Sequence, residues 1–460
     1  MPIKIKFSQD FSIDSSLILC CFLHLLGLLS YVFSLQKRVR LSGGPLPKDG
    51  PAPTRVHTPR PELDNLRPTS IAVLDFPVFV SEPLSVYCLV IEINTKEKMD
   101  KGKKVLIIGA GVFGLSTALE LSHRGYSNIT ILDRHVPPVP GGSSVDISRI
   151  VRPDYADRFY AKMGMEALAG WQEDFSAFFY RSGLLCAQAG TEFGNAYLTE
   201  AKSNLENIRA EVDLWAYTGR EVNERYSGIH GDLSQTSGYC NLDAGWVDAA
   251  KSIEHLAKLC KEAGATFLSG DSGIVTELIT SETGGVKTIT GVRTANGKVL
   301  TADIVIMATG AWTSHLIGAG NRFISTGQPV GYMQLTPEEA DEMRENPVMI
   351  NLSTGWFAFP PTPDDNILKM ARHGYGFETT HASNSTRYSA PSMALQSDYL
   401  PADAEQALRD GLALFLPNFK DRPFSKRRLC WYTDTPKGDF VVDYHPEYTN
   451  LFVATGGSGQ

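Results

Sequence analysis

The sequence contains little that would support a metal site or a nucleic-acid interface. Its seven cysteines are scattered, with no C-x-x-C pair and no other spacing typical of metal ligands, so we expect no metal. The net charge of −8 gives no electrostatic reason to expect nucleic-acid binding. No internal repeat or low-complexity tract is apparent. The remaining composition, 43% hydrophobic and 20% charged, is that of a globular protein of 460 residues that is long enough for two intertwined domains.

An apolar run without acidic or basic side chains, apart from His24, occupies residues 15–35 and is long enough to cross a bilayer. Basic residues follow it at 37–40, so the positive-inside rule puts the downstream chain on the cytoplasmic face. We therefore predict a signal-anchor transmembrane helix and a membrane anchor if this segment is expressed, and a cytosolic protein if it is not. Residues 42–68 are rich in proline, glycine and basic residues and are expected to be a linker. Because the globular pattern starts only after Met99, residues 1–98 are predicted to form an N-terminal extension.

The most informative motif is a G-x-G-x-x-G supplied by Gly109, Gly111 and Gly114. It follows residues 105–108, an apolar run typical of a buried parallel strand, and it opens a segment with helical spacing of apolar residues. The first glycine permits a tight turn, the second lets a pyrophosphate approach the backbone, and the third lets the helix pack closely on the strand. The motif predicts a dinucleotide site but does not distinguish NAD(P) from FAD.

Two further features belong to the same predicted site. A second strand, residues 129–132, ends at Asp133, about 20 residues after the glycines, where a carboxylate accepts hydrogen bonds from a ribose. Farther along, the apolar run 304–307 leads into a small-residue turn that contains Gly310, which a cofactor could approach closely.

The rest of the globular region alternates between helical and extended patterns. The Asn296-Gly297 pair predicts a hairpin turn. Short strands from residue 328 onward, among them 328–335, 356–359 and 367–370, indicate a second, mostly antiparallel sheet. Helices are expected from 112 up to Gly125 and at 160–182, 203–226, 248–264, 337–346 and 402–416. Strands are expected at 266–268, 275–278, 287–293, 299–302, 304–307, 328–335, 356–359, 367–370, 440–442 and 451–454.

Three polar positions stand out from these patterns, and the residues alone leave their roles open. Arg149 and Arg152, three residues apart, could clamp anions or could form a solvated helix face. Cys430, beside Trp431, would by itself be interpreted as a core cysteine.

Taken together, the motifs resemble the flavin-dependent amine oxidases of the monomeric sarcosine oxidase group, which includes pipecolate, saccharopine and fructosyl amino acid oxidases and has a fold of the D-amino-acid oxidase type. The resemblance covers residues 103–459. It depends on several motifs in order: GAGVFG, SRIVRPDY, TANGKVLTADIVIMATGAW, FAFP…LKMARHG and LCWYTDTP…DFVVDYHP…GGSG.

The resemblance implies an α/β fold like that of glutathione reductase. A Rossmann-type FAD-binding domain would comprise residues 103–190, 236–325 and 425–460. A second, mostly antiparallel-sheet substrate domain would comprise residues 191–235 and 326–424.

The resemblance also implies that the cofactor is FAD, bound covalently through Cys430 to the 8-methyl carbon of the isoalloxazine. The residues expected to bind it are Gly109, Ala110, Gly111, Val112, Phe113, Gly114, Asp133, Arg134, Ser143, Ser144, Arg149, Val275, Gly310, Cys430, Gly456 and Gly459.

The residues that match the family's catalytic positions are expected to act around the flavin. Arg149 matches the basic residue that faces the flavin, and Arg152 matches the arginine that holds the substrate carboxylate. Lys369 matches the lysine that assists the reaction with O₂, where a cation stabilises the developing negative charge. His373 and Tyr432 match positions on the substrate side.

The activity implied is oxidation of the C–N bond of a secondary or N-substituted amino acid by O₂, giving an imine and H₂O₂. Pipecolate- and saccharopine-like substrates are favoured over sarcosine and over fructosyl amines, because the fructosyl amino acid oxidases tend to carry lysine where this chain has Arg149. The alternatives are an inactive flavin-binding protein and an NAD(P)-dependent dehydrogenase. The sequence does not indicate an oligomeric state.

The family pattern continues beyond the last glycines with His-Gly-Phe-Lys, whose lysine is a second anchor for the substrate carboxylate. It then has a closing segment that often ends in a peroxisomal tripeptide. The present sequence ends at Gln460 and has no counterpart of these features. The resemblance therefore implies weaker substrate binding and no peroxisomal address.

Overall fold

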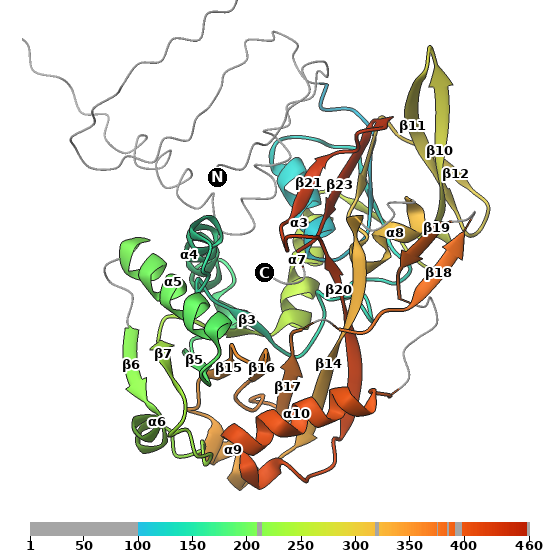
Figure 1. The fold of residues 1–460 in the computed structure, drawn as a ribbon. Coiled ribbons are helices and arrows are strands. Elements are labelled where there is room, and N and C mark those ends of the chain that lie inside the picture. Colours follow the sequence, from blue (N-terminus) through green and yellow to red (C-terminus); the bar gives the residue numbers. More distant parts are fainter. Residues whose placement is uncertain are drawn as a thin grey trace, which may run out of the picture. The chain divides into compact units, whose positions relative to one another are not determined.

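The computed structural model describes residues 100–208, 214–317, 322–374, 376–383, 386–391 and 398–457, which belong to one unit of the chain (Figure 1). The predicted linker and transmembrane segment, and Gly459, lie outside the described residues.

A six-stranded sheet carries the glycine motif, and its strands are parallel except for β21 at one edge. Its central strands, β1 and β13, are fully buried, which explains why their sequences are uninterrupted apolar runs rather than alternating ones. In sheet order the strands are β21 (Val441–Tyr444), β23 (Leu451–Thr455), β13 (Ile304–Met307), β1 (Val105–Ile108), β2 (Ile129–Leu132) and β9 (Thr266–Leu268).

Two helices pack together beside this sheet. Helix α3 (Val112–His123) contacts β1, β2 and β23, and it ends before Gly125, which has a φ of 91°. Helix α7 (Ala249–Glu262) begins at Asp248, whose side chain accepts a hydrogen bond from the backbone N–H of Lys251. Its buried face includes Cys260, which contacts α3 at the carbonyl of Leu115. Both helices confirm the expected positions.

A four-stranded sheet lies next in the chain, with the predicted hairpin at its centre. Strands β10 (Val275–Thr283), β11 (Val286–Thr294) and β12 (Val299–Thr301) are antiparallel, and β22 (Tyr448–Thr449) adds to β11 in parallel. The turn between β11 and β12 uses Gly297 with a φ of 83°, a conformation that glycine adopts without steric cost.

The second large sheet has eight strands, and all of its neighbouring strands are antiparallel except β15 and β5. It confirms the mostly antiparallel second sheet. In order the strands are β20 (Lys426–Asp434), β14 (Ile324–Gln334), β17 (Ile367–Arg372), β16 (Trp356–Ala358), β15 (Val348–Asn351), β5 (Leu184–Gln188), β7 (Ser237–Asn241) and β6 (Leu214–Thr218).

Helix α10 (Ala402–Phe415) covers one face of this sheet through a large apolar cluster (Figure 1). Trp356 stacks on Phe415 with ring centroids 5.1 Å apart, and a Cβ at Gly411 would lie 2.2 Å from the Trp356 ring. Along β17, Leu368 and Met370 belong to this cluster. Because side chains alternate along a strand, the intervening Lys369 and Ala371 face the opposite side of the sheet.

The remaining elements complete the described chain. They are β3 (Arg149–Val151), α4 (Arg158–Gln172), η2 (Ser176–Phe178), β4 (Phe179–Tyr180), α5 (Glu192–Ile208), α6 (Gly219–Arg225), β8 (Gly245–Val247), η3 (Gly270–Ser272), η4 (Gly310–Trp312), α8 (Thr313–Leu316), α9 (Pro337–Met343), β18 (Thr380–Ser383), β19 (Thr386–Ser389) and η6 (Pro417–Phe419).

Two expectations about local structure were wrong, and one open alternative is now decided. The helix predicted over 203–226 is divided among the end of α5, strand β6 and helix α6, because β6 pairs with β7 at the edge of the large sheet. The helix predicted over 160–182 ends at Gln172, since the following aromatic residues form η2 and β4, which pairs with β8. The open alternative concerned Arg149 and Arg152. Since Arg149 is in strand β3, it does not belong to a solvated helix face.

The expected transmembrane helix also needs correction. No helix in the described part of the chain is long and apolar enough to span a bilayer. The longest described helix, α5, has 17 residues and carries charged side chains along its length, whereas a spanning helix needs about 20 predominantly apolar residues. Residues 15–35, for which the helix was predicted, lie outside the described residues.

The predicted division into two domains stays a prediction. The glycine motif belongs to the six-stranded sheet. However, β5, β7 and β20, which the predicted boundaries assign to the FAD-binding segments, are strands of the eight-stranded sheet.

Candidate active site

A cavity of about 1200 Å³ is lined by both large sheets. One part of its wall comes from the turns that follow β1 and β13, and another comes from β14, β17 and β20. Strand β14 pairs with β17 on one side and with β20 on the other, placing Gln328 opposite Cys430 and Tyr332 opposite Lys369. This pairing brings Lys369 and Cys430, distant in sequence, to the same cavity.

The glycine turn has the geometry expected of a phosphate-binding turn. Gly109 has a φ of 111°, and a Cβ there would lie 2.3 Å from the carbonyl oxygen of Ala308. A Cβ at Gly114 would lie 1.9 Å from the Gly109 oxygen, so only glycine allows α3 to approach the turn this closely. Gly111 begins α3 without a side-chain cap and lines the cavity. The N-terminus of α3 therefore offers backbone N–H groups and a favourable dipole to an anion.

Asp133 lies at the end of β2, as expected, and is fixed by the backbone. Its carboxylate accepts hydrogen bonds of 2.7 Å from the N–H groups of Ala110 and Arg134. Burial raises the pKa of Asp133, and these two hydrogen bonds oppose that change. The guanidinium of Arg134 stacks over Trp312, 3.8 Å from the ring centroid, and closes this part of the cavity wall.

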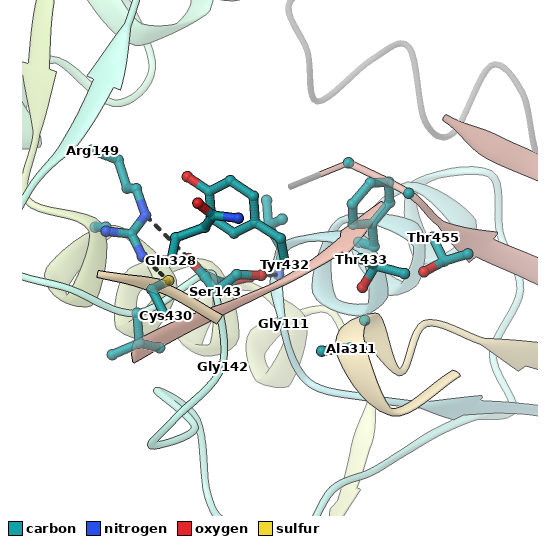
Figure 2. Close-up of a pocket in the computed structure, with 18 of the residues that line it drawn as sticks. Gly111, Gly142, Ser143, Arg149, Ala311, Gln328, Cys430, Tyr432, Thr433 and Thr455 are labelled. Atoms are coloured by element: carbon teal, nitrogen blue, oxygen red, sulfur yellow. Dashed lines mark hydrogen bonds between the residues drawn. The ribbon is translucent and has the colours of Figure 1, made fainter. Parts of the chain in front are cut away.

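Cys430 and Arg149 are in direct contact. The buried Cys430 sulfur lies 3.3 Å from Nη2 of Arg149, and the same guanidinium donates to the carbonyl of Ser143 at 2.8 and 3.1 Å (Figure 2). Burial disfavours the charge on Arg149, but Cys430 and Asp146 outweigh it and raise its pKa. The sulfur thus lies beside a fixed positive charge.

Asp146 forms the centre of a buried charge cluster. Its Oδ2 lies 2.7 Å from Nη1 of Arg149, 3.1 Å from Nζ of Lys369 and 2.9 Å from Nη2 of Arg428. Its Oδ1 accepts a 2.7 Å hydrogen bond from the hydroxyl of Tyr332. Burial alone would raise the pKa of Asp146, but the three cations outweigh burial and hold it well below the usual value.

Lys369 is 1% exposed and lines the cavity. Besides its ion pair with Asp146, its Nζ donates to the carbonyl of Ser148 at 2.5 Å and lies 4.6 Å from the ring centroid of Phe359. Burial lowers the pKa of Lys369 to about 7, with Asp146 acting against that change and Arg149 contributing to it. This side chain therefore gains and loses its charge near neutral pH.

Arg152 occupies a different part of the cavity wall. Its guanidinium stacks over Tyr155 at 4.2 Å, donates to the backbone carbonyl of Asp154 and lies 3.3 Å from the hydroxyl of Tyr197. Burial opposes its charge, yet Tyr197, Tyr155 and Asp154 raise its pKa. Arg152 is thus a positively charged side chain that its neighbours fix in place at the cavity wall.

His373 and Tyr432 lie together, with ring centroids 5.5 Å apart. Gln328 fixes the turn that follows His373, because its side chain accepts from the N–H of Gly374 at 3.0 Å and donates to the Gly374 carbonyl at 3.1 Å. All four residues line the cavity, and burial raises the pKa of Tyr432.

The cavity brings together nearly all residues expected at the site. Gly114 is not at its wall but packs beneath the turn, and Gly459 lies outside the described residues. The expected residues that line the cavity are Gly109, Ala110, Gly111, Val112, Phe113, Asp133, Arg134, Ser143, Ser144, Arg149, Arg152, Val275, Gly310, Lys369, His373, Cys430, Tyr432 and Gly456.

Four residues around the cavity were not predicted from the sequence: Asp146, Arg428, Tyr332 and Gln328. The position of Asp146, three residues before Arg149, was the one local signal available. Its contacts with Lys369 and Arg428 depend on strand pairing and have no signature in the sequence.

The parallel sheet, its glycine turn and a cavity that continues to buried basic residues define a dinucleotide-dependent oxidoreductase. Residues 104–460 match the model of the family described as FAD dependent oxidoreductase, and the chain belongs to that family. The family assignment and the fold confirm the resemblance found in the sequence.

Relatives and solved structures agree with this assignment. L-saccharopine oxidase of Schizosaccharomyces pombe is 30% identical over 372 residues, covering 78% of this chain and 86% of the relative. Monomeric sarcosine oxidase of Bacillus sp. strain NS-129 is 25% identical, covering 77% and 88%. The structure of fructosamine oxidase (Amadoriase II) of Aspergillus fumigatus in complex with FSA superposes with a TM-score of 0.71 at 27% identity, covering 79% of this chain and 83% of that one.

The residues present fit the FAD that gives this family its name. The glycines at 109 and 114 let the turn and α3 pack closely against each other, Gly111 at the N-terminus of α3 lines the cavity, and Asp133 is fixed at the end of β2. The cavity extends from this turn to Cys430 and Lys369, which suits an elongated dinucleotide.

Proposed function

We propose that this protein is an FAD-dependent oxidase of secondary or N-substituted amino acids, which uses O₂ and produces H₂O₂. The observation that carries the proposal is the buried, cavity-lining Lys369 held by Asp146. A positive charge in such a site can stabilise the negative charge that develops as O₂ is reduced. The named relatives support the substrate class, since saccharopine, sarcosine and fructosamines are all secondary amines.

The substrate carboxylate would be held by Arg152. A planar guanidinium binds a carboxylate through two parallel hydrogen bonds, and stacking on Tyr155 keeps its orientation fixed. His373 and Tyr432 would border the amine and its substituent. These contacts would orient the carbon–hydrogen bond next to nitrogen toward the cofactor.

The cofactor supplies the redox chemistry when it is bound, taking a hydride equivalent from the substrate carbon and passing its electrons to O₂. The pyrophosphate would be held by the N-terminus of α3 and the ribose by Asp133. Arg149 would place a positive charge beside the ring system, and the protonated form of Lys369 would stabilise the oxygen anion. Water then hydrolyses the released imine.

We propose further that Cys430 bonds covalently to the flavin. Support comes from its position on the cavity wall and from the Arg149 guanidinium, whose Nη2 lies 3.3 Å from the sulfur. Acid-precipitated wild-type protein should stay yellow, whereas Cys430→Ala should release its flavin into the supernatant. Cys260→Ala, which changes a buried cysteine on α7, is the matched control and should keep the colour. Release of all flavin from the wild type would exclude the covalent bond.

The activity itself is tested by mixing the protein anaerobically with pipecolate, saccharopine, sarcosine or a fructosyl amino acid. Bleaching of the flavin absorbance, followed by H₂O₂ release when O₂ is admitted, is the expected result. Bound flavin that none of these amines reduces would favour an inactive flavin-binding protein. Absence of flavin absorbance, with turnover of NAD(P)H, would favour the dehydrogenase.

A further inference from the structure

We propose that Asp146 is a positioning residue, the shared counter-ion of Lys369, Arg149 and Arg428, and that the balance of these charges sets the pH range in which the enzyme reacts with O₂. This inference rests on the proposed function, because it assigns Lys369 to the reaction with O₂. It adds two residues, Asp146 and Arg428, that do not line the cavity.

Asp146 itself contacts all three cations and is not one link in a series of separate ion pairs. A single oxygen, Oδ2, lies within 3.1 Å of nitrogen atoms from three cations. These cations come from β3, β17 and β20, so one carboxylate ties three strands together. The other oxygen is occupied by the Tyr332 hydroxyl from β14. Side-chain exposure is 2% for both Asp146 and Lys369, so water does not screen this pair.

The cluster contains more positive than negative charge. Three cations share this one buried carboxylate, and the other titratable groups nearby are Tyr332, Cys430 and Tyr432. Burial raises the pKa of both tyrosines, so their hydroxyls are neutral near pH 7. Lys369 is the cation that can relieve this excess, since arginine does not lose its proton in proteins. A pKa of about 7 for Lys369 agrees with a charge balance of this kind.

Two substitutions should therefore shift the titration of Lys369 in opposite directions. Asp146→Asn removes the attraction and leaves the repulsion from the two arginines, which favours neutral Lys369. Arg428→Met removes a repelling cation and leaves Asp146 with fewer competitors, which favours charged Lys369. Both substitutions break contacts of the same cluster. A purely structural role would therefore predict similar damage from both and no opposite shift.

The test is the pH profile of flavin reoxidation. The flavin of the holoenzyme is reduced photochemically, so that no amine substrate is needed, and mixed with O₂ in a stopped-flow instrument. The wild-type rate should fall as pH rises through about 7. The midpoint should move down by about one pH unit or more in Asp146→Asn and up by a similar amount in Arg428→Met. Lys369→Met should be slow at every pH.

A second readout follows Lys369 itself. In protein labelled with ¹⁵N-lysine, the Nζ resonance of Lys369 is identified by its loss in Lys369→Met, and its titration should show the same two opposite shifts. Asp154→Asn is the matched control, since Asp154 is a buried acid on the other side of β3 and makes no ion pair with Lys369. It should leave both midpoints unchanged.

The outcomes separate this inference from the proposed function. Midpoints that move in the same direction, or that do not move, overturn the role of Asp146. If Asp146→Asn does not fold, Arg428→Met still decides, because an unchanged midpoint in that variant refutes the charge balance. Opposite shifts in a protein whose flavin no amine reduces would leave the inference standing and the proposed substrate class refuted.

Discussion

Two buried carboxylates flank strand β3, and their surroundings differ. Asp146, on one side, is surrounded by Lys369 and two arginines. Asp154, on the other side, accepts hydrogen bonds from two uncharged groups. The Tyr239 hydroxyl donates at 2.8 Å and the Asn241 amide at 2.9 Å. Both residues are buried: counted over the whole residue, Asp146 is 7% exposed and Asp154 is 1% exposed.

The two surroundings have opposite effects on the pKa of these acids. Burial would raise the pKa of each, but the cations outweigh burial at Asp146 and lower it, whereas burial prevails at Asp154 and raises it. Arg152, next to Asp154, donates to its backbone carbonyl, and among the described residues no carboxylate forms an ion pair with it. We infer that the cations on the flavin side are balanced within the protein, while Arg152 is balanced by the substrate carboxylate.

The largest expected difference between the two sites is in stability. Asp146→Asn leaves the buried Lys369 and two partly buried arginines without their shared counter-ion, which should lower the free energy of unfolding by about 3–5 kcal/mol. Asp154→Asn keeps the shape of the side chain, but its amide N–H₂ faces the Tyr239 hydroxyl or the Asn241 amide, which both donate hydrogen bonds to Asp154. The lost hydrogen bond should cost about 1–3 kcal/mol. Denaturant titration of both variants measures the difference. Equal losses would mean that the cations do not depend on Asp146.

The next largest effect should distinguish Lys369 from Arg152 by the half-reaction that each residue affects. Lys369→Met should slow flavin reoxidation by about two orders of magnitude or more, because one preorganised charge beside the developing anion is lost. Anaerobic reduction of the flavin by substrate should stay largely intact. Stopped-flow measurement of each half-reaction tests this, and unchanged reoxidation would show that Lys369 is misassigned.

Arg152→Met should instead weaken substrate binding and leave the reaction with O₂ intact. Loss of a hydrogen bond to a charged group costs about 1.5–3 kcal/mol, so the apparent KM should rise roughly ten- to a hundredfold. The reoxidation rate should not change. Arg152→Lys keeps the charge without the planar pair of donors and should fall between the two. A KM that is insensitive to both substitutions would place the carboxylate elsewhere.

A feature of the fold or the site could be predicted from the sequence where neighbouring residues determine it. It could not be predicted where residues distant in the chain determine it. Strand β1, the glycine turn and strand β2 were located to the residue, because a strand–turn–helix unit is specified by neighbouring residues. Strand β6 was missed since pairing with β7 overrides a locally helical pattern. Roles for Lys369 and Cys430 came from family resemblance rather than from physical reasoning.

The charge cluster could not be predicted for a related reason. Asp146 meets Lys369 and Arg428 only because β14 pairs with both β17 and β20 in one register. A sequence gives no register between strands that are distant in the chain, so it could identify acids and bases but not their partners. The same limit explains why Gln328, which fixes the turn after His373, was missed.

The smallest expected effect, measured as the change over one pH unit, is a pH dependence of stability that originates at Lys369. Its pKa is about 7 in the folded protein against an ordinary value of 10.5, so between these values the unfolded chain holds a proton that the folded chain does not. Stability should therefore rise with pH across this window, by at most about 1.4 kcal/mol per pH unit, and be lost again as pH falls toward 7. Lys369→Met should remove that rise, whereas Asp154→Asn should retain it, because the carboxyl of Asp154 titrates in a different environment. Unfolding free energies at pH 6 to 10 for the three proteins measure the slopes. Parallel curves for the wild type and Lys369→Met would mean that Lys369 keeps its charge throughout, and the balance inferred around Asp146 would then be wrong.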